Sequence, residues 1–296
     1  MPIPEAQLET WSHQGSITQS SDTYNSVKLS LTASGSHYSV NDCEVFLQGS
    51  YGNDTNIFSE SDVDIVIKLN SCFHHDLTQL TADQQAHFKS CHSDATYTHV
   101  NFKDDVLKVL RDRYGSAIDA GEKAIAIAAN GNRRKADVIA AIQFRRFVKF
   151  LSTSDQSYED GICFYTRSGA QIVNYPKQHS GNLTRKHQAT SRWLKPLVRI
   201  FKNMRSKLID EGMLVAGMAP SYYLEGLLYN VPNDKFGGNY QQTFADVINW
   251  IRNSDRSKFV CANEQYYLFH AYSPVTWRSE QCDTFLTSAV TLWEQW

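Results

Sequence analysis

Three aspartates in the first half of the chain have the types and spacing that metal-dependent phosphoryl chemistry requires. Asp62 and Asp64 stand two residues apart in DVDIVIKL, a run that alternates as a strand does, so both carboxylates project from one face. Asp137 stands in a later strand-like run, KADVIAAIQF. Neighbouring carboxylates repel each other, and Mg²⁺, which prefers hard oxygen ligands, relieves that repulsion. If the two strands are neighbours, the carboxylates can hold two Mg²⁺ ions about 3.5–4 Å apart.

A glycine-serine turn precedes the aspartate pair. Residues 44–48 (EVFLQ) predict a short strand that ends at Gly49-Ser50, and a polar turn follows. Glycine allows backbone N–H groups to approach a phosphate, and a serine hydroxyl can donate a hydrogen bond to one. An Asp-x-Asp pair alone is most often a solvated strand face or a turn. A strand, a Gly-Ser turn and a second strand with Asp-x-Asp together indicate a phosphate and metal site much more strongly.

A basic segment in the second half is the other candidate for phosphate binding. Eight basic residues and no acidic residue lie from Arg185 to Lys207. On a helix, Lys195, Arg199 and Lys202 are four and three residues apart and form one stripe. A solvated basic face and a phosphate-binding face explain this stripe equally well when the segment is taken alone.

The elements that must position these residues divide the chain into two parts. Strands and a few helices come first, and from about residue 191 the apolar residues follow helical spacing, which predicts an α+β chain. We expect a catalytic lobe over residues 1–180 and a helical lobe over residues 181–296. An amphipathic helix predicted near residues 15–36 is not assigned to one lobe alone. The other predicted elements are a helix at 103–114, strands at 123–128, 134–144 and 162–166, and a polar connection at 70–100.

The composition excludes several other classes of protein. The 296 residues include 29 basic and 31 acidic ones, and the net charge of −2 excludes a generally basic nucleic-acid coat protein. The longest apolar runs are far shorter than the roughly 18–20 residues of a membrane span, and no signal peptide is expected. Six scattered cysteines predict a cytoplasmic protein with reduced thiols. The sequence has no P-loop motif, which argues against a P-loop ATPase.

Cysteine and histidine residues gather between residues 72 and 99 and give a weaker signal. His87 and Cys91 are four residues apart and could share a helix face. Structural zinc sites usually carry paired Cys/His modules, and no C-x-x-C pair is present. Ordinary surface histidines are the favoured interpretation, and a structural zinc site is the alternative.

The segment LQGSYGNDTNIFSESDVDIVIKL (residues 47–69) resembles the signature of the polymerase-β-like nucleotidyltransferases. Three later stretches are similar to one branch, the bacterial CD-NTases, which are cyclic GMP–AMP synthase/DncV-like enzymes. These stretches are NYPKQH (174–179), VRIFKNMR (198–205) and PSYYLEGLLYNVP (220–232). The resemblance implies a catalytic lobe with a mixed β-sheet, a helical C-terminal lobe and an active site in the cleft between them.

The resemblance also assigns roles to individual residues. Catalysis and the binding of two Mg²⁺ ions, for which Mn²⁺ can substitute, fall to Asp62, Asp64 and Asp137. Donor-nucleotide binding falls to Gly49, Ser50, Lys202, Ser221 and Tyr222. The last of these stacks on the donor base, and the other four hold the triphosphate. Without the resemblance, Ser221 is expected to cap a helix, and the adjacent tyrosines are expected to be core aromatics.

The implied activity is Mg²⁺-dependent synthesis of a cyclic di- or trinucleotide messenger from nucleoside triphosphates, ATP among them, with release of pyrophosphate. The implied context is bacterial antiphage signalling of the CBASS type, with a phage-derived cue or a regulatory protein partner. Neither a membrane nor DNA or RNA is indicated as a partner. Two alternatives stay open: linear nucleotidyl transfer to RNA, a protein or a small molecule, and a catalytically silent nucleotide-binding regulator. Three intact carboxylates speak against the second.

Overall fold

The computed structural model describes residues 1–59, 62–270 and 275–296, and the chain forms two compact units. The sheet unit comprises Thr18–Gln48 and Asp62–Pro176. The helical unit comprises Met1–Ile17, Gly49–Ser61 and Lys177–Trp296. The Gly-Ser turn therefore belongs to the helical unit, although it directly follows a strand of the sheet unit. Glu60 and Ser61 of the signature segment lie outside the described residues.

A seven-stranded mixed sheet forms the core of the sheet unit, with the order β1-β2-β5-β4-β3, while β6 pairs with β5 and β7 with β6. The parallel pair is β2 with β5, and the other pairs are antiparallel. The strands are β1 (Cys43–Leu47), β2 (Val63–Asp76), β3 (Ile118–Ala120), β4 (Ile125–Ile127), β5 (Ala136–Phe150), β6 (Gln156–Tyr165) and β7 (Gln171–Asn174). The two strands predicted around the aspartates are present and are neighbours, which meets the condition for their carboxylates to lie close together.

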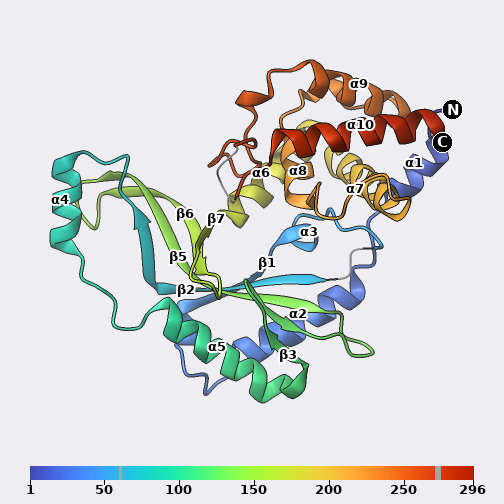
Figure 1. Cartoon of the computed structure of the whole chain (residues 1–296). Helices are drawn as coiled ribbons and strands as arrows, with labels where there is room; N and C mark the ends of the chain where they lie inside the picture. Colours follow the sequence, from blue (N-terminus) through green and yellow to red (C-terminus); the bar gives the residue numbers. More distant parts are fainter. Residues whose placement is uncertain (60–61, 271–274) are drawn as a thin grey trace. The chain divides into compact units, whose positions relative to one another are not determined.

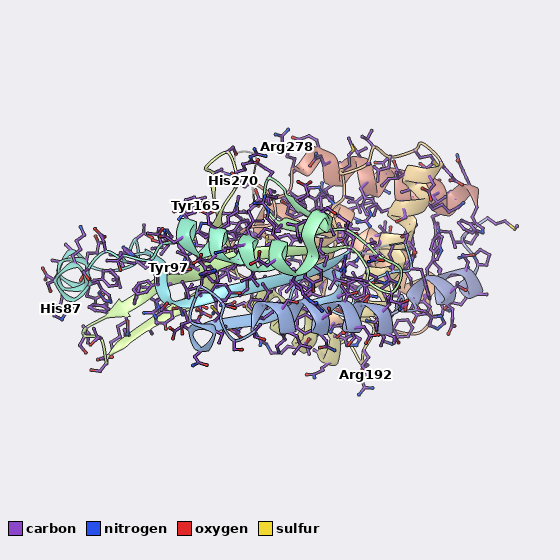
Figure 2. The ribbon with its side chains drawn as sticks, turned by 90° about the horizontal axis from the view of Figure 1, so that it is seen from below. His87, Tyr97, Tyr165, Arg192, His270 and Arg278 are labelled. Atoms are coloured by element: carbon purple, nitrogen blue, oxygen red, sulfur yellow. The ribbon has the colours of Figure 1, made fainter. Side chains whose placement is uncertain are left out.

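Two helices, α2 (Thr18–Leu31) and α5 (His99–Tyr114), lie side by side over one face of this sheet (Figures 1 and 2). They pack there because apolar residues recur at helical spacing; Val27 and Val106, for example, are fully buried. The prediction of a helix ending at Gly115 is confirmed, and that glycine has a φ of 56°, which favours glycine at a helix end.

The polar connection predicted at 70–100 is wrong in part. Strand β2 continues to Asp76, and helix α4 (Ala82–Cys91) follows at the far end of the long strands (Figure 1). Phe88 of α4 packs against Phe147 and Phe150 of β5, and all three are buried. These contacts stabilise a segment that the sequence analysis predicted to be a polar connection, because a few well-spaced aromatic residues are enough to bury one face.

The helical unit is built around α7 (Leu194–Asp210), which packs against α1, α8 and α10. Leu197, Phe201 and Met204 are fully buried on its apolar face. The other helices are α1 (Glu5–Ser12), α3 (Gly49–Gly52), α6 (Pro176–Ala189), α8 (Ser221–Tyr229), α9 (Tyr240–Asn253) and α10 (Ser279–Gln295). Short 3₁₀ turns lie at Val40–Asp42, Gly115–Ala117, Asn233–Lys235 and Arg256–Lys258. Within the described part of the chain, no helix combines the length and apolar character needed to cross a membrane.

Candidate active site

Two of the three predicted carboxylates lie on neighbouring parallel strands of the sheet unit, and Asp62 immediately precedes the first of these strands. Asp64 of β2 is directly opposite Asp137 of β5 in the register. Adjacent strands lie about 4.7–4.9 Å apart, so these two residues stand side by side on one face. Asp62 precedes Asp64 by two residues and projects from the same face. The strand pairing therefore sets Asp64 beside Asp137, with Asp62 directly before the start of β2.

A lysine that sequence reasoning missed lies among these carboxylates. The Nζ atom of Lys135 is 2.5 Å from Oδ2 of Asp62 and 3.6 Å from Oδ2 of Asp137. The hydrogen bond to Asp62 raises the pKa of Lys135, against the lowering effect of burial, so its side chain is an ammonium ion at neutral pH. Its position two residues before Asp137 was the available signal, because residues two apart on a strand share a face.

The donor set fits a hard divalent cation, although the side chains are not arranged around one. All three candidate ligands are carboxylates, the chemistry that Mg²⁺ prefers, and Asp62 and Asp137 already share one cationic group. Among the described residues, no three His, Cys, Asp or Glu side chains are close enough together to hold a metal ion as they stand. To hold one ion together, the three carboxylates would have to turn toward a common centre.

The Gly-Ser turn forms helix α3, a single helical turn of the helical unit. Gly49 begins it with a φ of 63°, a left-handed conformation that favours glycine. The backbone N–H of Asn53 donates to the Gly49 carbonyl at 3.0 Å, and that of Thr55 donates to the Ser50 carbonyl at 2.9 Å. Ser50 is thereby fixed at the start of a tight, internally bonded segment.

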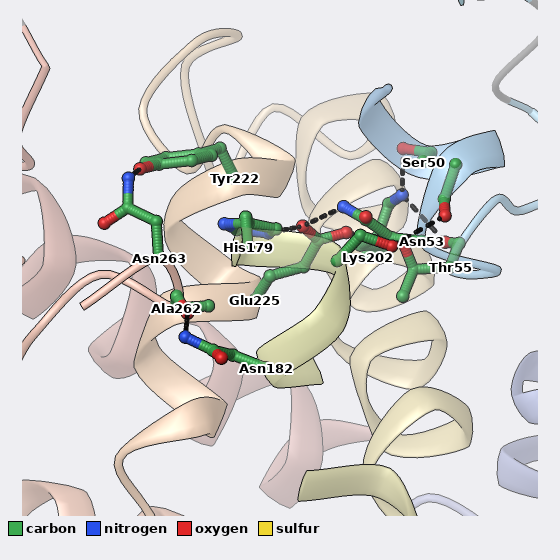
Figure 3. Close-up of polar contacts among 12 residues, drawn as sticks. Ser50, Asn53, Thr55, His179, Asn182, Lys202, Tyr222, Glu225, Ala262 and Asn263 are labelled. Carbon is green, nitrogen blue, oxygen red and sulfur yellow. Dashed lines mark hydrogen bonds and ion pairs between the residues drawn. The ribbon is translucent and has the colours of Figure 1, made fainter. Parts of the chain in front are cut away.

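The basic stripe of α7 contacts this segment. Lys195 donates to Oδ2 of Asp54 at 2.9 Å, and Nη1 of Arg199 donates to the Asp54 carbonyl at 2.6 Å. Asp54 has a left-handed φ of 55°, which aspartate tolerates better than most residues. Lys202 is fully buried and donates to Oγ of Ser50 at 2.7 Å (Figure 3). The stripe therefore holds the turn in place; the two interpretations based on the sequence did not include this role.

A buried carboxylate, which sequence reasoning also missed, lies behind the turn. Glu225 of α8 is 2% exposed and accepts hydrogen bonds from Nδ2 of Asn53 at 3.0 Å, from the Thr55 hydroxyl and from Nε2 of His179 at 2.7 Å (Figure 3). Lys202 also donates to the Thr55 carbonyl at 2.8 Å. We call these five residues the Glu225 cluster.

The Glu225 cluster keeps its carboxylate ionised. Burial raises the pKa of Glu225, but the hydrogen bond from His179 and the charges of His179 and Lys202 outweigh it, and the net effect is a lowered pKa. A glutamate inside the apolar stretch of α8 was the available signal in the sequence, because such a residue is almost never buried without partners.

Tyr222 and Tyr223 differ in their surroundings. The Tyr222 ring stacks on His179 with ring centroids 4.8 Å apart and an interplanar angle of 20°, and its hydroxyl accepts from Asn263 at 3.0 Å. Burial raises the pKa of Tyr222, so it is protonated at neutral pH. Tyr223 stacks on buried Trp277, as expected of a packing residue.

The prediction that Ser221 caps a helix is wrong. Helix α8 begins at Ser221 itself, and Pro220 occupies the N-cap position without a side-chain hydrogen bond. Proline starts the helix because its fixed φ, here −57°, suits the entry into a helical turn. The Ser221 hydroxyl instead accepts a hydrogen bond from Nη1 of Arg205 at 3.0 Å.

Several histidines of the Cys/His-rich segment are not ordinary surface residues. His99 is 4% exposed, and its Nε2 atom lies 3.0 Å from the Ala140 carbonyl. Nε2 of His74 lies 3.0 Å from the Tyr165 hydroxyl. Burial lowers the pKa of both histidines, so they are neutral at pH 7. His87, labelled in Figure 2, lies on α4 with its Nε2 atom 3.8 Å from Sγ of Cys91, so this pair shares a helix face as predicted.

Comparison with known proteins identifies the family. A family model described as the cGAS/DncV-like nucleotidyltransferase C-terminal helical domain matches residues 181–294. A curated cyclic UMP-AMP synthase of Rhodothermus marinus is 43% identical over 100% of this chain and 99% of its own length. The cyclic nucleotide synthase CdnE01 of Staphylococcus haemolyticus is 37% identical over 100% of both chains.

Solved structures agree with the sequence comparison. A Rhodothermus marinus CdnE c-UMP-AMP synthase, solved with Apcpp and Upnpp, matches with a TM-score of 0.89 and 42% identity over 100% of this chain and 98% of that one. The chain belongs to the cGAS/DncV-like nucleotidyltransferases, and it is a nucleotidyltransferase related to enzymes that make cyclic nucleotides. The predicted α+β, polymerase-β-like fold with a helical C-terminal domain is confirmed.

Proposed function

We propose that this enzyme joins nucleoside triphosphates, ATP among them, into a cyclic di- or trinucleotide in a Mg²⁺-dependent reaction that releases pyrophosphate. The observation that carries the proposal is the register of β2 and β5, which sets Asp64 opposite Asp137 and leaves Asp62 on the same face. The relatives named cyclic UMP-AMP synthase and cyclic dipyrimidine nucleotide synthase support a ring of two nucleotides.

Asp62, Asp64 and Asp137 are the residues that would hold the metal. Bound Mg²⁺ would lower the pKa of the attacking ribose hydroxyl and stabilise the charge that develops on the leaving pyrophosphate. Asp137 stands beside Asp64 in the register, where a carboxylate can also help to accept the hydroxyl proton. The attacking oxygen forms a bond to the α-phosphorus, the bond from the α-phosphorus to the bridging oxygen breaks, and pyrophosphate leaves. A second transfer closes the ring.

The donor triphosphate would be held by serines that cationic side chains orient. An ammonium group can only donate, so the Ser50 oxygen accepts from Lys202 and the hydroxyl can direct its own proton to a phosphate oxygen. The Ser221 hydroxyl oxygen likewise accepts a hydrogen bond from a cation, the guanidinium of Arg205. A hydroxyl that accepts a charged hydrogen bond is polarised and donates more strongly. Lys202 thus acts on the triphosphate through Ser50, and Gly49 allows the backbone to approach the phosphates.

Tyr222 would hold the donor base by stacking. One face of its ring is backed by His179, and the Asn263 side chain holds its hydroxyl, so the ring has a defined plane. Stacking on an aromatic ring is worth about 1–3 kcal/mol per base and suits every base. The resemblance further supports a role in bacterial antiphage signalling in the cytoplasm, switched on by a phage-derived cue or a regulatory protein.

The test is incubation of the purified chain with all four nucleoside triphosphates and Mg²⁺, followed by mass spectrometry of phosphatase-treated products. We expect a phosphatase-resistant cyclic product from the native enzyme, and a loss of at least about a thousandfold in rate for Asp64→Asn and for Asp137→Asn. Asp112→Asn, which changes an exposed carboxylate on α5, is the matched control and should keep full activity.

Other outcomes distinguish the alternatives. A linear, nuclease-sensitive product, or label transferred to an acceptor, would show that the enzyme catalyses linear nucleotidyl transfer and not cyclisation. Nucleotide binding without turnover, across divalent ions and candidate activators, would point to a regulatory binding protein.

A further inference from the structure

Two lysines of the sheet unit each contact two carboxylates, and they differ in burial. Lys68 of β2 lies 2.9 Å from Asp160 and 3.6 Å from Glu44, and its side chain is only 4% exposed. Lys135 contacts Asp62 and Asp137 at 2.5 and 3.6 Å, but its side chain is 44% exposed. Lys68 is therefore enclosed within the sheet unit, whereas the ammonium of Lys135 can move into water at little cost.

The backbone of Lys135 is fixed even though its side chain can move. The N–H of Val63 donates to the Lys135 carbonyl at 2.9 Å, and the register pairs Val63 with Ala136. This pairing holds the lysine at the same level as Asp62, on the face from which the aspartates project. The strand pairing that assembles the carboxylates therefore also brings a positive charge to them.

We propose that Lys135 is an exchangeable counter-ion of the metal site: its ammonium draws Asp62 and Asp137 together in the metal-free enzyme and is displaced when the divalent cation binds. The inference rests on the proposed function, because it takes these carboxylates to be the metal ligands. Metal binding is then an exchange: the contacts of Lys135 with Asp62 and Asp137 are lost, and contacts of the metal ion with the same two carboxylates replace them.

The exchange has two consequences: Lys135 weakens metal binding, and it stabilises the metal-free protein. Lys135 lowers the affinity of the free enzyme for a divalent ion, because the ion must displace it. It also stabilises the metal-free fold, because it offsets the repulsion among the carboxylates. A lysine with only a structural role would stabilise the fold equally with and without metal, and it would not weaken metal binding.

The experiment measures Mn²⁺ binding without nucleotide, by the loss of the free-ion electron paramagnetic resonance signal, for the native enzyme, Lys135→Met and Lys135→Arg. We expect Lys135→Met to bind Mn²⁺ about tenfold more tightly than the native enzyme, since it lacks one competing charge at partly exposed carboxylates. Lys135→Arg keeps the charge and should bind about as weakly as the native enzyme. Equal or weaker binding by Lys135→Met overturns the proposal.

Thermal unfolding supplies a second measurement on the same proteins. In EDTA, Lys135→Met should melt at a lower temperature than the native enzyme, and saturating Mn²⁺ should abolish or reverse that difference. A melting temperature lowered by the same amount in both conditions would contradict the exchange.

The variant Asp137→Asn separates the exchange from the proposed function. If it binds Mn²⁺ as well as the native protein, the metal site itself is misplaced and the proposed function fails. If it loses Mn²⁺ while Lys135→Met gains nothing, only the exchange fails.

Discussion

The Glu225 cluster of the helical unit and the group of carboxylates around Lys135 in the sheet unit are built in opposite ways. In the helical unit, Glu225 is 2% exposed and accepts from three side chains. In the sheet unit, the side chains of Asp62 and Asp137 are 42% and 29% exposed, and both contact Lys135. The Glu225 carboxylate is enclosed and accepts hydrogen bonds on both oxygens, whereas the carboxylates around Lys135 are partly open to water.

The difference in burial matches two different roles: the Glu225 cluster positions the turn, and the carboxylates around Lys135 are the proposed metal ligands. A buried carboxylate that loses a partner leaves an uncompensated charge, so the Glu225 cluster holds one arrangement. That rigidity suits the proposed role of the turn from Gly49 to Thr55, which must keep its shape while nucleotides come and go. Exposed ion pairs contribute little and rearrange easily. That freedom suits carboxylates that must accept metal ions and release them with the product.

The largest effect on stability is expected at the enclosed cluster. Glu225→Ala removes the acceptor of Asn53, Thr55 and His179 and should lower the free energy of unfolding by about 3–5 kcal/mol. Glu225→Gln keeps the volume and one acceptor oxygen and should cost less. Urea unfolding measures both, and Glu211→Ala, at the exposed C-cap position of α7, is the control. A loss of less than about 1 kcal/mol for Glu225→Ala would remove the contrast between the clusters.

A smaller effect is expected at the residue that the cluster positions. Ser50→Ala removes the hydroxyl between Lys202 and the proposed triphosphate and should lower kcat/KM about 10- to 100-fold, equivalent to one charge-assisted hydrogen bond. Ser59→Ala, at an exposed position of the same segment, should have no effect. Steady-state kinetics at saturating Mg²⁺ provide the measurement. Unchanged kinetics in Ser50→Ala would show that the Ser50 hydroxyl does not bind the nucleotide.

The pH dependence of stability tests whether Glu225 is ionised in the folded protein. Its folded-state pKa lies below the ordinary 4.5, so the unfolded chain takes up this proton first as the pH falls. The stability from the ionised form is therefore complete above about pH 4.5 and is lost as the pH falls through the folded-state pKa. As the pH falls from 6 to below 4.5, the free energy of unfolding should decrease more steeply for the native enzyme than for Glu225→Gln. Parallel curves from urea unfolding would show that the buried carboxylate is not the titrating group.

The smallest effect is expected at an exposed ion pair between the last turn of α7 and its C-cap residue. Lys207 lies 2.7 Å from Glu211, with the two side chains 36% and 42% exposed. Lys207→Met should change the free energy of unfolding by no more than about 0.5 kcal/mol. Lys202→Met, five residues earlier and fully buried in the native chain, should cost several times more in the same urea experiment. Similar costs would mean that burial does not distinguish the charged contacts of α7.

Local patterns in the sequence predicted the parts of the site that depend on neighbours along the chain. The alternation around Asp62 and Asp64 placed both on one face of a strand, and Gly49-Ser50 was located at a strand end. The amphipathic pattern of α7 identified the basic stripe. Helical and strand periodicity are properties of a few consecutive residues, and for this reason they can be read without the fold.

Tertiary structure decided which distant residues meet. Lys135 and Asp62 are 73 positions apart, Lys202 and Ser50 are 152 apart, and Asn53 and Glu225 are 172 apart. No local pattern encodes such pairs, because they arise from strand register and helix packing. The sequence by itself determined the aspartates, the turn and the helices that could do this chemistry. The fold alone decided that Asp137 stands opposite Asp64, that a lysine lies among the carboxylates and that a buried glutamate holds the turn, because burial and long-range pairing exist only once the chain has packed.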